Sequence, residues 1–453
     1  MLSNSLATHF LANKSLATKC CTVIFCSILS CTTYATNLTD VYQAAADSDP
    51  QIRAAEASMK AQLETYNQSR AGLLPDVRVS ANTTWTEREF DNNPREEFNS
   101  NGYSARLVQP LIRADRWFNL LSARATNKRA LAEYAEAKQA LILRVAEAYF
   151  NVLRAEDNLT SATAQEKAFK RQLDQIQERF DVGLVAITGV HEAQAAYDLA
   201  RVTRITQDEA RYNSLTALET LTKRRFETVA LLDKKIPVSR PEKVSDQWVT
   251  IALENNLSLS ARRLAVDEAK QALREQKSGH LPTLDAVATY THSENGGSAF
   301  LGNESDVEQY SLELNIPIFQ GGATRSRVRQ SHHLLNVAKE NYENTFRQVK
   351  QDILTQHRTV NSDVLRVGAQ KLALRSSKSA LEATEGGYEV GTRNIVDVLQ
   401  ARDRVFQSER DYANAIYDYI LNQLRLKQIA GTLNEQDLLD LNQWLIASTP
   451  TAP

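Results

Sequence analysis

The sequence is poor in residues that interrupt helices, and its cysteines occupy one short stretch. Its 453 residues include only 15 glycines and 10 prolines, a composition typical of long helices rather than of many small compact domains. The four cysteines are Cys20, Cys21, Cys26 and Cys31. Because no cysteine follows Cys31, the rest of the chain can form neither a disulfide nor a cysteine-ligated zinc site.

The sequence also lacks the features of a nucleic-acid-binding protein and of an enzyme. Lysine and arginine together number 53, and aspartate and glutamate 55, so no basic excess exists to attract nucleic acid. The seven histidines are scattered apart from the pair His332-His333, and the chain has neither a G-x-G-x-x-G pattern nor a Ser-His-Asp context. We therefore expect no enzymatic activity, no cofactor and no metal site.

The first 35 residues are predicted to be a secretory signal peptide. They contain no acidic residue, carry Lys14 and Lys19, and lead through an apolar run to a small-residue site at Ala35. That run is about 11 residues long, too short for a membrane-spanning helix, which needs roughly 20. Two alternatives stay open: the run is a buried helix, or the four residues ending at Cys31 form a lipoprotein signal, although Leu29 is bulky where a small residue is usual.

The remaining chain is built from two similar halves. A shift of 207 residues superimposes Pro75 on Pro282 and Pro110 on Pro317, and two such matches at one spacing argue against chance. The same shift superimposes Ala45 on Ala252, Ala54 on Ala261, Gly72 on Gly279, Leu74 on Leu281, Ala81 on Ala288, Tyr103 on Tyr310 and Leu107 on Leu314. We predict a first structural repeat at 36–235, a second at 236–447 and a tail at 448–453. Each repeat has the order helix, strand, strand, very long helix, helix.

Four segments carry the alternation of β-strands. From Val77 to Trp85, apolar and polar residues alternate with a period of two, which places them on opposite faces of a strand. The other strands are predicted at 103–111, 284–291 and 310–318, and a polar loop at 87–102. Strands of this length with one apolar face fit a membrane β-barrel, and a soluble sandwich with one wet face is the alternative.

Four strands cannot close into a barrel by themselves, and an open sheet edge is not tolerated in lipid. Several chains must therefore contribute strands. Two chains would give eight strands, whose interior fills with side chains, whereas three would give twelve and leave room for a channel. We therefore favour a homotrimer in contact with membrane lipid.

Two proline-free segments, 111–236 and 318–449, predict very long helices. Apolar residues with the four-and-three spacing of a coiled-coil seam include Leu141, Val145, Ala148, Val152, Ala155 and Leu159. The helix predicted at 117–182 has 66 residues and would be about 100 Å long. The shorter helices at 38–71 and 395–430, placed end to end, would have about the same length as this long helix. We therefore predict a cylinder wall in which long helices lie beside stacked pairs of short ones.

A matched glycine turn follows each long helix. Val182-Gly183-Leu184 and Val390-Gly391-Thr392 superimpose at a shift of 208 residues. Glycine adopts the positive φ that ends a helix and reverses the chain. Each turn is therefore predicted to be the far end of a helical hairpin.

Several stretches closely resemble the TolC family of trimeric outer-membrane exit ducts. Their sequences are AYFNVL at 148–153, RFDVGLVAIT at 179–188, GHLPTL at 279–284, GYEVGTRNIVDVLQ at 387–400 and GTLNEQDLL at 431–439. The resemblance implies a mainly α-helical fold with a membrane β-barrel, in which a trimer forms a 12-stranded barrel in the outer membrane on a coiled-coil tunnel in the periplasm.

The resemblance also implies partners and cargo. A periplasmic adaptor (a membrane fusion protein) and an inner-membrane RND, ABC or MFS transporter would dock to the tunnel and open it. The duct would then serve efflux of small molecules such as drugs, bile salts and detergents, and type I secretion of proteins.

The family's functional residues correspond to positions at the two turns. The adaptor-docking tips would be Val182, Gly183, Leu184, Val390, Gly391 and Thr392. Tyr388 and Arg393 would be ties that hold the tunnel closed, with Thr188 beside them, and Asp397 would belong to an acidic ring at the constriction.

Two residues depart from the member that gives the family its name. Gly189 replaces an aspartate after Thr188, a change that bears on the Tyr388 tie. Gln400 replaces a second aspartate one helical turn beyond Asp397, which leaves one carboxylate layer instead of two. A coiled-coil surface stalk or adhesin without a channel is the alternative function, and the paired strands with one apolar face argue against it.

Overall fold

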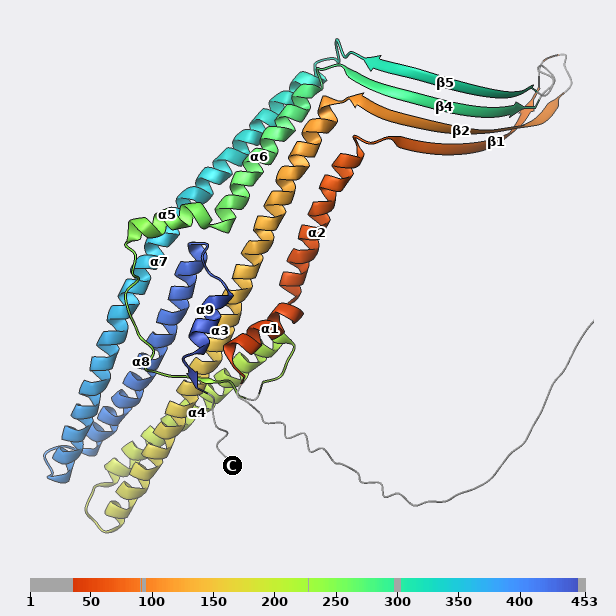
Figure 1. The fold of residues 1–453 in the computed structure, drawn as a ribbon. Coiled ribbons are helices and arrows are strands. Elements are labelled where there is room, and N and C mark those ends of the chain that lie inside the picture. Colours follow the sequence, from red (N-terminus) through yellow and green to blue (C-terminus); the bar gives the residue numbers. More distant parts are fainter. Residues whose placement is uncertain (1–35, 90, 92–94, 227, 297–302, 447–453) are drawn as a thin grey trace, which may run out of the picture. The chain divides into compact units, whose positions relative to one another are not determined.

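The structure, a computed structural model, describes residues 36–89, 91, 95–226, 228–296 and 303–446 (Figure 1). These residues belong to one compact unit. The predicted signal peptide at 1–35 and the predicted tail at 448–453 lie outside the described residues, and the limits of the two repeats stay predictions. None of the helices in the described ranges is both long enough and apolar enough to cross a membrane.

Long helices dominate the described chain. The helices are α1 (Leu38–Ser48), α2 (Pro50–Ala71), α3 (Ala114–Asp181), α4 (Ile187–Thr222), α5 (Ser245–Asn255), α6 (Leu257–Ser278), α7 (Ala323–Glu389), α8 (Ile395–Ile429) and α9 (Glu435–Asn442). α3 and α7 have 68 and 67 residues, so each is about 100 Å long. α3 packs along α2, α4 and α6, and α7 packs along α6 and α8 (Figure 1). The two very long helices, each with a return helix, are thus confirmed.

The helix predicted at 38–71 is instead broken at Asp49. This residue has extended backbone angles, φ −65° and ψ 119°, and its carboxylate accepts a hydrogen bond of 3.1 Å from the Gln51 N–H. Pro50 occupies the first turn of α2, where its missing N–H costs nothing, and it disfavours helical angles at the residue before it. Asn256 makes the equivalent break between α5 and α6, so the prediction of one continuous helix is wrong.

Four strands form one antiparallel sheet with the order β1-β2-β4-β5 (Figure 1). They are β1 (Asp76–Arg88), β2 (Glu96–Ile112), β4 (Thr283–Asn295) and β5 (Asn303–Asn315). The polar loop predicted at 87–102 is wrong in its second half, because the chain from Glu96 onward already pairs with β1. Polar contacts join this part of the hairpin, among them a 2.8 Å ion pair between Arg88 and Glu96. Residues 96–102 contain one apolar side chain, Phe98, so apolar alternation gave no signal in this part of β2.

The register of the sheet gives it one apolar and one polar face. Val79 faces Ala105, and Leu107 faces Ala288 on the same side. The opposite side carries Ser80 paired with Ser104, whose hydroxyls are 2.9 Å apart. The predicted alternation is therefore confirmed, but the strand predicted at 310–318 is wrong beyond Asn315, where β5 ends. Apolar side chains of the first face are exposed: Val77, Val79, Trp85, Tyr310, Leu312 and Leu314.

The main core lies where α3, α7 and α8 meet. The predicted seam residues Leu141, Val145 and Val152 of α3 are buried in it. Tyr149 is fully buried there, and its hydroxyl donates a 2.9 Å hydrogen bond to the carbonyl of Ala230. Beside this core, the two-residue strand β3 (Leu231–Leu232) pairs with β6 (Leu445–Ile446). The main core and this small sheet therefore hold the long helices together at positions far from the two turns.

Candidate functional site

The two turns have the same backbone structure. After α3, Leu184 N donates to Arg179 O and Gly183 N donates to Phe180 O, both at 2.8 Å. After α7, Thr392 N donates to Gly387 O at 2.9 Å and Gly391 N donates to Tyr388 O at 3.1 Å. These paired bonds are the Schellman motif, which uses the last carbonyls of a helix and needs a left-handed residue. Gly183 and Gly391 supply it, with φ of 76° and 78°.

The turns present apolar side chains to solvent. Val182, Leu184 and Val390 are 70%, 73% and 75% exposed. A Cβ atom at Gly183 or Gly391 would meet no atom within 4 Å. Each tip therefore has exposed apolar side chains on a backbone that the glycine turn reverses.

A small apolar cluster joins the bases of the two turns. This tip cluster consists of Phe169, Leu173, Ile176, Val190, Ala193, Ala200, Ile395, Val398 and Leu399. A Cβ atom at Gly189 would lie 3.5 Å from Cγ2 of Ile395, so the first turns of α4 and α8 are in contact. Thr188, one residue earlier, is exposed. The structure thus brings the two hairpins of one chain together just behind their tips.

Tyr388 packs on the tip cluster, but its hydroxyl makes no bond within the described residues. The Arg179 guanidinium lies 5.4 Å from the centre of the Tyr388 ring. The Tyr388 hydroxyl is buried and has no hydrogen-bond partner there. A buried hydroxyl without a partner is unusual in a native protein. The structure therefore shows no Tyr388–Thr188 tie within one chain.

Asp397 caps the first turn of α8. Its backbone N–H donates to Oδ1 of Asn394 at 2.9 Å, and its Oδ2 accepts from the Asn394 N–H at 3.3 Å. This reciprocal pair is a capping box, and a carboxylate at a helix N-terminus is further stabilised by the helix dipole. Arg393 Nη1 is 4.0 Å from Asp397 Oδ2, and the Arg393 side chain is exposed. Asp397 therefore has a structural role at the start of α8.

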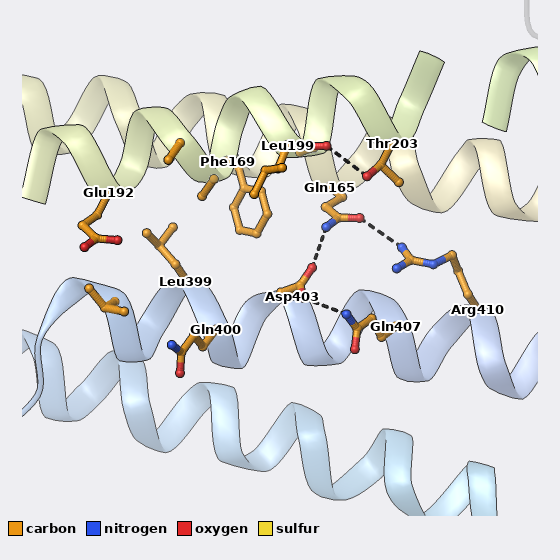
Figure 2. Close-up of a pocket in the computed structure, with 14 residues that line it drawn as sticks. Gln165, Phe169, Glu192, Leu199, Thr203, Leu399, Gln400, Asp403, Gln407 and Arg410 are labelled. Carbon is orange, nitrogen blue, oxygen red and sulfur yellow. Dashed lines mark hydrogen bonds between the residues drawn. The ribbon is translucent and has the colours of Figure 1, made fainter. Parts of the chain in front are cut away.

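Gln400 lies at the edge of a cavity of about 460 Å³ between α3, α4 and α8 (Figure 2). Across this cavity, Gln165 Nε2 donates to Asp403 Oδ1 at 2.7 Å, and Arg410 Nη1 donates to Gln165 Oε1 at 3.0 Å. Gln407 donates to the second oxygen of Asp403 at 2.8 Å. Sequence reasoning missed this network, because each member is an ordinary polar residue on a long helix.

Arg402 was missed as well, and it connects three helices. Its guanidinium forms an ion pair with Glu385 of α7 and donates to Gln172 of α3 at 3.2 Å. Arg402 stands four residues after Val398 and three before Val405, so it interrupts the apolar seam of α8. A charged residue at a seam position was the signal that could have found it.

No group of three or more histidine, cysteine, aspartate or glutamate side chains suited to a metal ion occurs in the part of the chain that the structure describes. The tips have exposed apolar side chains, the partly exposed carboxylate of Asp397 and the Tyr388 hydroxyl, which has no partner among the described residues. Exposed apolar side chains of this kind are suited to binding another protein surface.

Comparisons with known proteins agree with this arrangement. The model of the family described as "Outer membrane efflux protein" matches residues 41–223 and 248–432. "Outer membrane protein TolC" of Vibrio cholerae is 37% identical over 422 residues, covering 92% of this chain and 95% of the relative. The protein of the same name from Escherichia coli is 37% identical over 435 residues, covering 92% and 87%.

More distant proteins match this chain in sequence or in structure. "Proteases secretion protein PrtF" of Dickeya chrysanthemi is 25% identical over 422 residues, covering 90% of this chain and 91% of the relative. Among solved structures, CusC has a TM-score of 0.77 at 15% identity and covers 87% of this chain and 92% of its own. The open state of the MtrE outer membrane channel of Neisseria gonorrhoeae has a TM-score of 0.76 at 18% identity and covers 88% and 91%.

Proposed function

This chain belongs to the outer membrane efflux protein family, and from that premise we propose that three copies form an exit duct opened by a periplasmic adaptor and an inner-membrane transporter. The chain is an outer-membrane channel of the efflux and secretion type. The observation that carries the proposal is the four-stranded sheet, which has an exposed apolar face and, among the described residues, two edges without a neighbouring strand.

An assembly of three copies accounts best for the exposed face and the open edges of this sheet. The exposed apolar face suits lipid, and the polar face suits a water-filled interior. Since the edges of β1 and β5 cannot remain open in lipid, neighbouring copies must cover them. Eight strands would leave an interior filled by side chains, whereas twelve leave a channel.

The tips are proposed to be the docking surface. Six residues form it: Val182, Gly183, Leu184, Val390, Gly391 and Thr392. A partner protein of complementary shape would cover these exposed apolar side chains. The proposed partner is a membrane fusion protein acting with an RND, ABC or MFS transporter. Docking to such an adaptor would require the tunnel to lie in the periplasm.

The gate is proposed to lie just behind the tips. The buried Tyr388 hydroxyl has no partner among the described residues, and Arg393 is exposed with only a 4.0 Å contact to Asp397. Both side chains are free to tie a neighbouring copy, where Thr188 is the exposed acceptor near the matching turn. Three copies of Asp397 around one axis would attract cations, as acidic rings do in cation channels. Gln400 adds no charge to that ring.

Conductance across a planar lipid bilayer tests the proposal. The purified full chain should insert and give discrete channels of low resting conductance, because the tips are closed without a partner. A coiled-coil stalk or adhesin would give no channel. Absence of conductance from correctly folded, membrane-extracted protein would contradict the proposed duct.

A further inference from the structure

The chain passes from the sheet to α7 through an exposed apolar segment. β5 ends at Asn315 and α7 begins at Ala323, at the end of the sheet from which the long helices extend (Figure 1). Between them, Ile318 and Phe319 are 94% and 85% exposed, the largest values among the bulky apolar side chains that the structure describes. Two neighbouring apolar side chains that are this exposed indicate a surface that another molecule covers.

The first turns of α7 carry positive charge without an acidic residue in the same stretch. No aspartate or glutamate occurs between Glu313 and Glu340, whereas Arg325, Arg327 and Arg329 all lie there. Their side chains are exposed, and none of them forms an ion pair within the part of the chain that the structure describes. Guanidinium groups without a carboxylate partner give the surface a positive potential, which attracts anions.

The matching corner of the first repeat lacks this arrangement. At the shift of 208 residues that relates the two glycine turns, the three arginines correspond to Trp117, Asn119 and Leu121. The first corner has Arg113 instead, and a 2.9 Å ion pair with Asp115 neutralises its guanidinium. A junction between the sheet and a long helix therefore does not need a run of exposed arginines, and the second corner has them for another reason.

Two of the three arginines share one face of α7. Successive residues of an α-helix are about 100° apart, so Arg325 and Arg329 lie on the same face and Arg327 on the opposite one. Along the helix axis Arg325 and Arg329 are separated by about 6 Å. The headgroup layer on each side of a bilayer is roughly 5 to 8 Å thick, so both guanidinium groups can lie within one such layer.

We propose that Ile318, Phe319, Arg325 and Arg329 form a corner site that binds an anionic phospholipid. The two apolar side chains would contact the acyl chains. The two guanidinium groups would donate hydrogen bonds to the phosphate, which a planar guanidinium binds in a bidentate manner. A free phosphate would leave the apolar pair uncovered, so a phospholipid fits the whole site. The proposal rests on the membrane barrel proposed above, which puts this end of the sheet at a membrane surface.

Quenching of tryptophan fluorescence by brominated lipids tests the corner site in the full chain. The corner reporter carries Phe319→Trp together with Trp85→Phe and Trp117→Phe. The sheet reporter keeps Trp85, which is exposed on the apolar face of β1, and carries only Trp117→Phe. Each is reconstituted into vesicles of one fixed mixture of phosphatidylcholine and phosphatidylglycerol, in which either the first or the second lipid is brominated. Because bromine quenches only at short range, the comparison reports which lipid contacts the tryptophan.

We expect brominated phosphatidylglycerol to associate with the corner reporter about fivefold more strongly than brominated phosphatidylcholine, the effect of a single arginine near an anionic lipid. Adding Arg325→Gln and Arg329→Gln should remove this preference. The control pair Lys371→Gln with Arg375→Gln has the same spacing on the same helix and removes the same charge, but it lies about 70 Å away. The preference should therefore persist in the control, and both lipids should quench the sheet reporter equally.

Equal quenching of the corner reporter by both lipids, or a preference that survives Arg325→Gln with Arg329→Gln, would overturn the corner site. Loss of the preference on adding inorganic phosphate at unchanged ionic strength would identify a free anion as the ligand and would overturn it as well. If neither lipid quenches the corner reporter while both quench the sheet reporter, the corner lies outside the lipid and the proposal is wrong. If neither reporter is quenched, the proposed barrel itself is contradicted.

Discussion

At the residue scale, Gly391 sets the shape of one tip. Its φ of 78° is left-handed, and a Cβ there would touch nothing within 4 Å, so substitution costs conformational energy rather than space. That cost is roughly 1–2 kcal/mol for residues other than glycine. We predict that Gly391→Val distorts the tip and abolishes export while trimers, whose strands lie elsewhere in the chain, persist. Export assays and the mass of the purified protein check this.

Gly386 supplies the control for Gly391. It lies inside α7, where an added Cβ also meets no atom within 4 Å and no positive φ is needed. Gly386→Ala should raise helix stability by about 0.5–1 kcal/mol and leave export unchanged. Normal export by Gly391→Val would reject the docking role of this tip.

The Asp397 side chain carries a negative charge and also caps α8. Two substitutions distinguish the effect of the charge from the effect of the cap. Asp397→Asn removes the charge but keeps an oxygen that can accept the Asn394 N–H. Asp397→Ala removes both and should cost a further 0.5–1 kcal/mol or so in unfolding free energy. We predict that both variants lose most of the block of conductance by divalent cations, in one step because Gln400 is neutral.

Bilayer recordings with added divalent cations measure that block, and thermal unfolding measures the cap. If the Asn variant keeps its cation block and selectivity, the constriction lies elsewhere. Glu385 and Glu389, which precede the same turn, are then the next acidic residues to test.

Tyr388 is expected to act through its hydroxyl. Tyr388→Phe keeps the ring on the tip cluster and removes only the buried hydroxyl that has no partner among the described residues. If that hydroxyl ties a neighbouring copy, the Phe variant should raise resting conductance, as should Arg393→Ala. An unchanged conductance together with unchanged or higher thermal stability would show that the hydroxyl makes no such tie.

At the scale of elements, Arg402 holds α8 against α3 and α7. Because Arg402 and Glu385 are only partly buried, the pair adds about 0–1 kcal/mol to stability. Its effect on geometry should be larger, since one side chain fixes three helices. We predict that Arg402→Ala raises resting conductance with little change in unfolding temperature.

The matched control is Arg404→Ala. Arg404 is exposed on the same helix two residues later, so this variant removes the same charge without breaking the contact among three helices. Resting conductance should stay at the level of the unaltered protein. Equal increases in the two variants would mean that the net charge of α8, and not the Arg402 contact, controls the closed state.

Helices and strands could be predicted from the sequence where their own residues carry the pattern that determines them. Apolar alternation located the strand around Val79, and the lack of proline located α3. The polar start of β2 at Glu96 was missed because pairing with β1, and not its own pattern, makes it a strand. The break at Asp49 had a local signal, an acid before proline, that a helical composition concealed.

In the candidate site too, some features could be predicted from local sequence and others could not. The turns at Gly183 and Gly391 were predictable, because a left-handed backbone requires glycine. The contact of Arg402 with Glu385 was not, because it depends on how α8 rotates against α7. The capping role of Asp397 needed only the sequence Asn394 to Asp397 but was obscured by the role that the family resemblance implied.

At the scale of the whole molecule, the proposed barrel contains six β-hairpins that are copies of one duplicated unit. Each copy contributes two units, joined through β2 and β4, and three copies would complete the barrel. The same duplication places two equivalent glycine turns at the docking end. The central claim is therefore the number of copies in one particle.

Multi-angle light scattering of the protein extracted in detergent, corrected for bound detergent, measures that number directly. The account predicts a single species of three chains, which also conducts in bilayers. A monodisperse monomer or dimer that retains native helix content would contradict the shared barrel and, with it, the proposed exit duct.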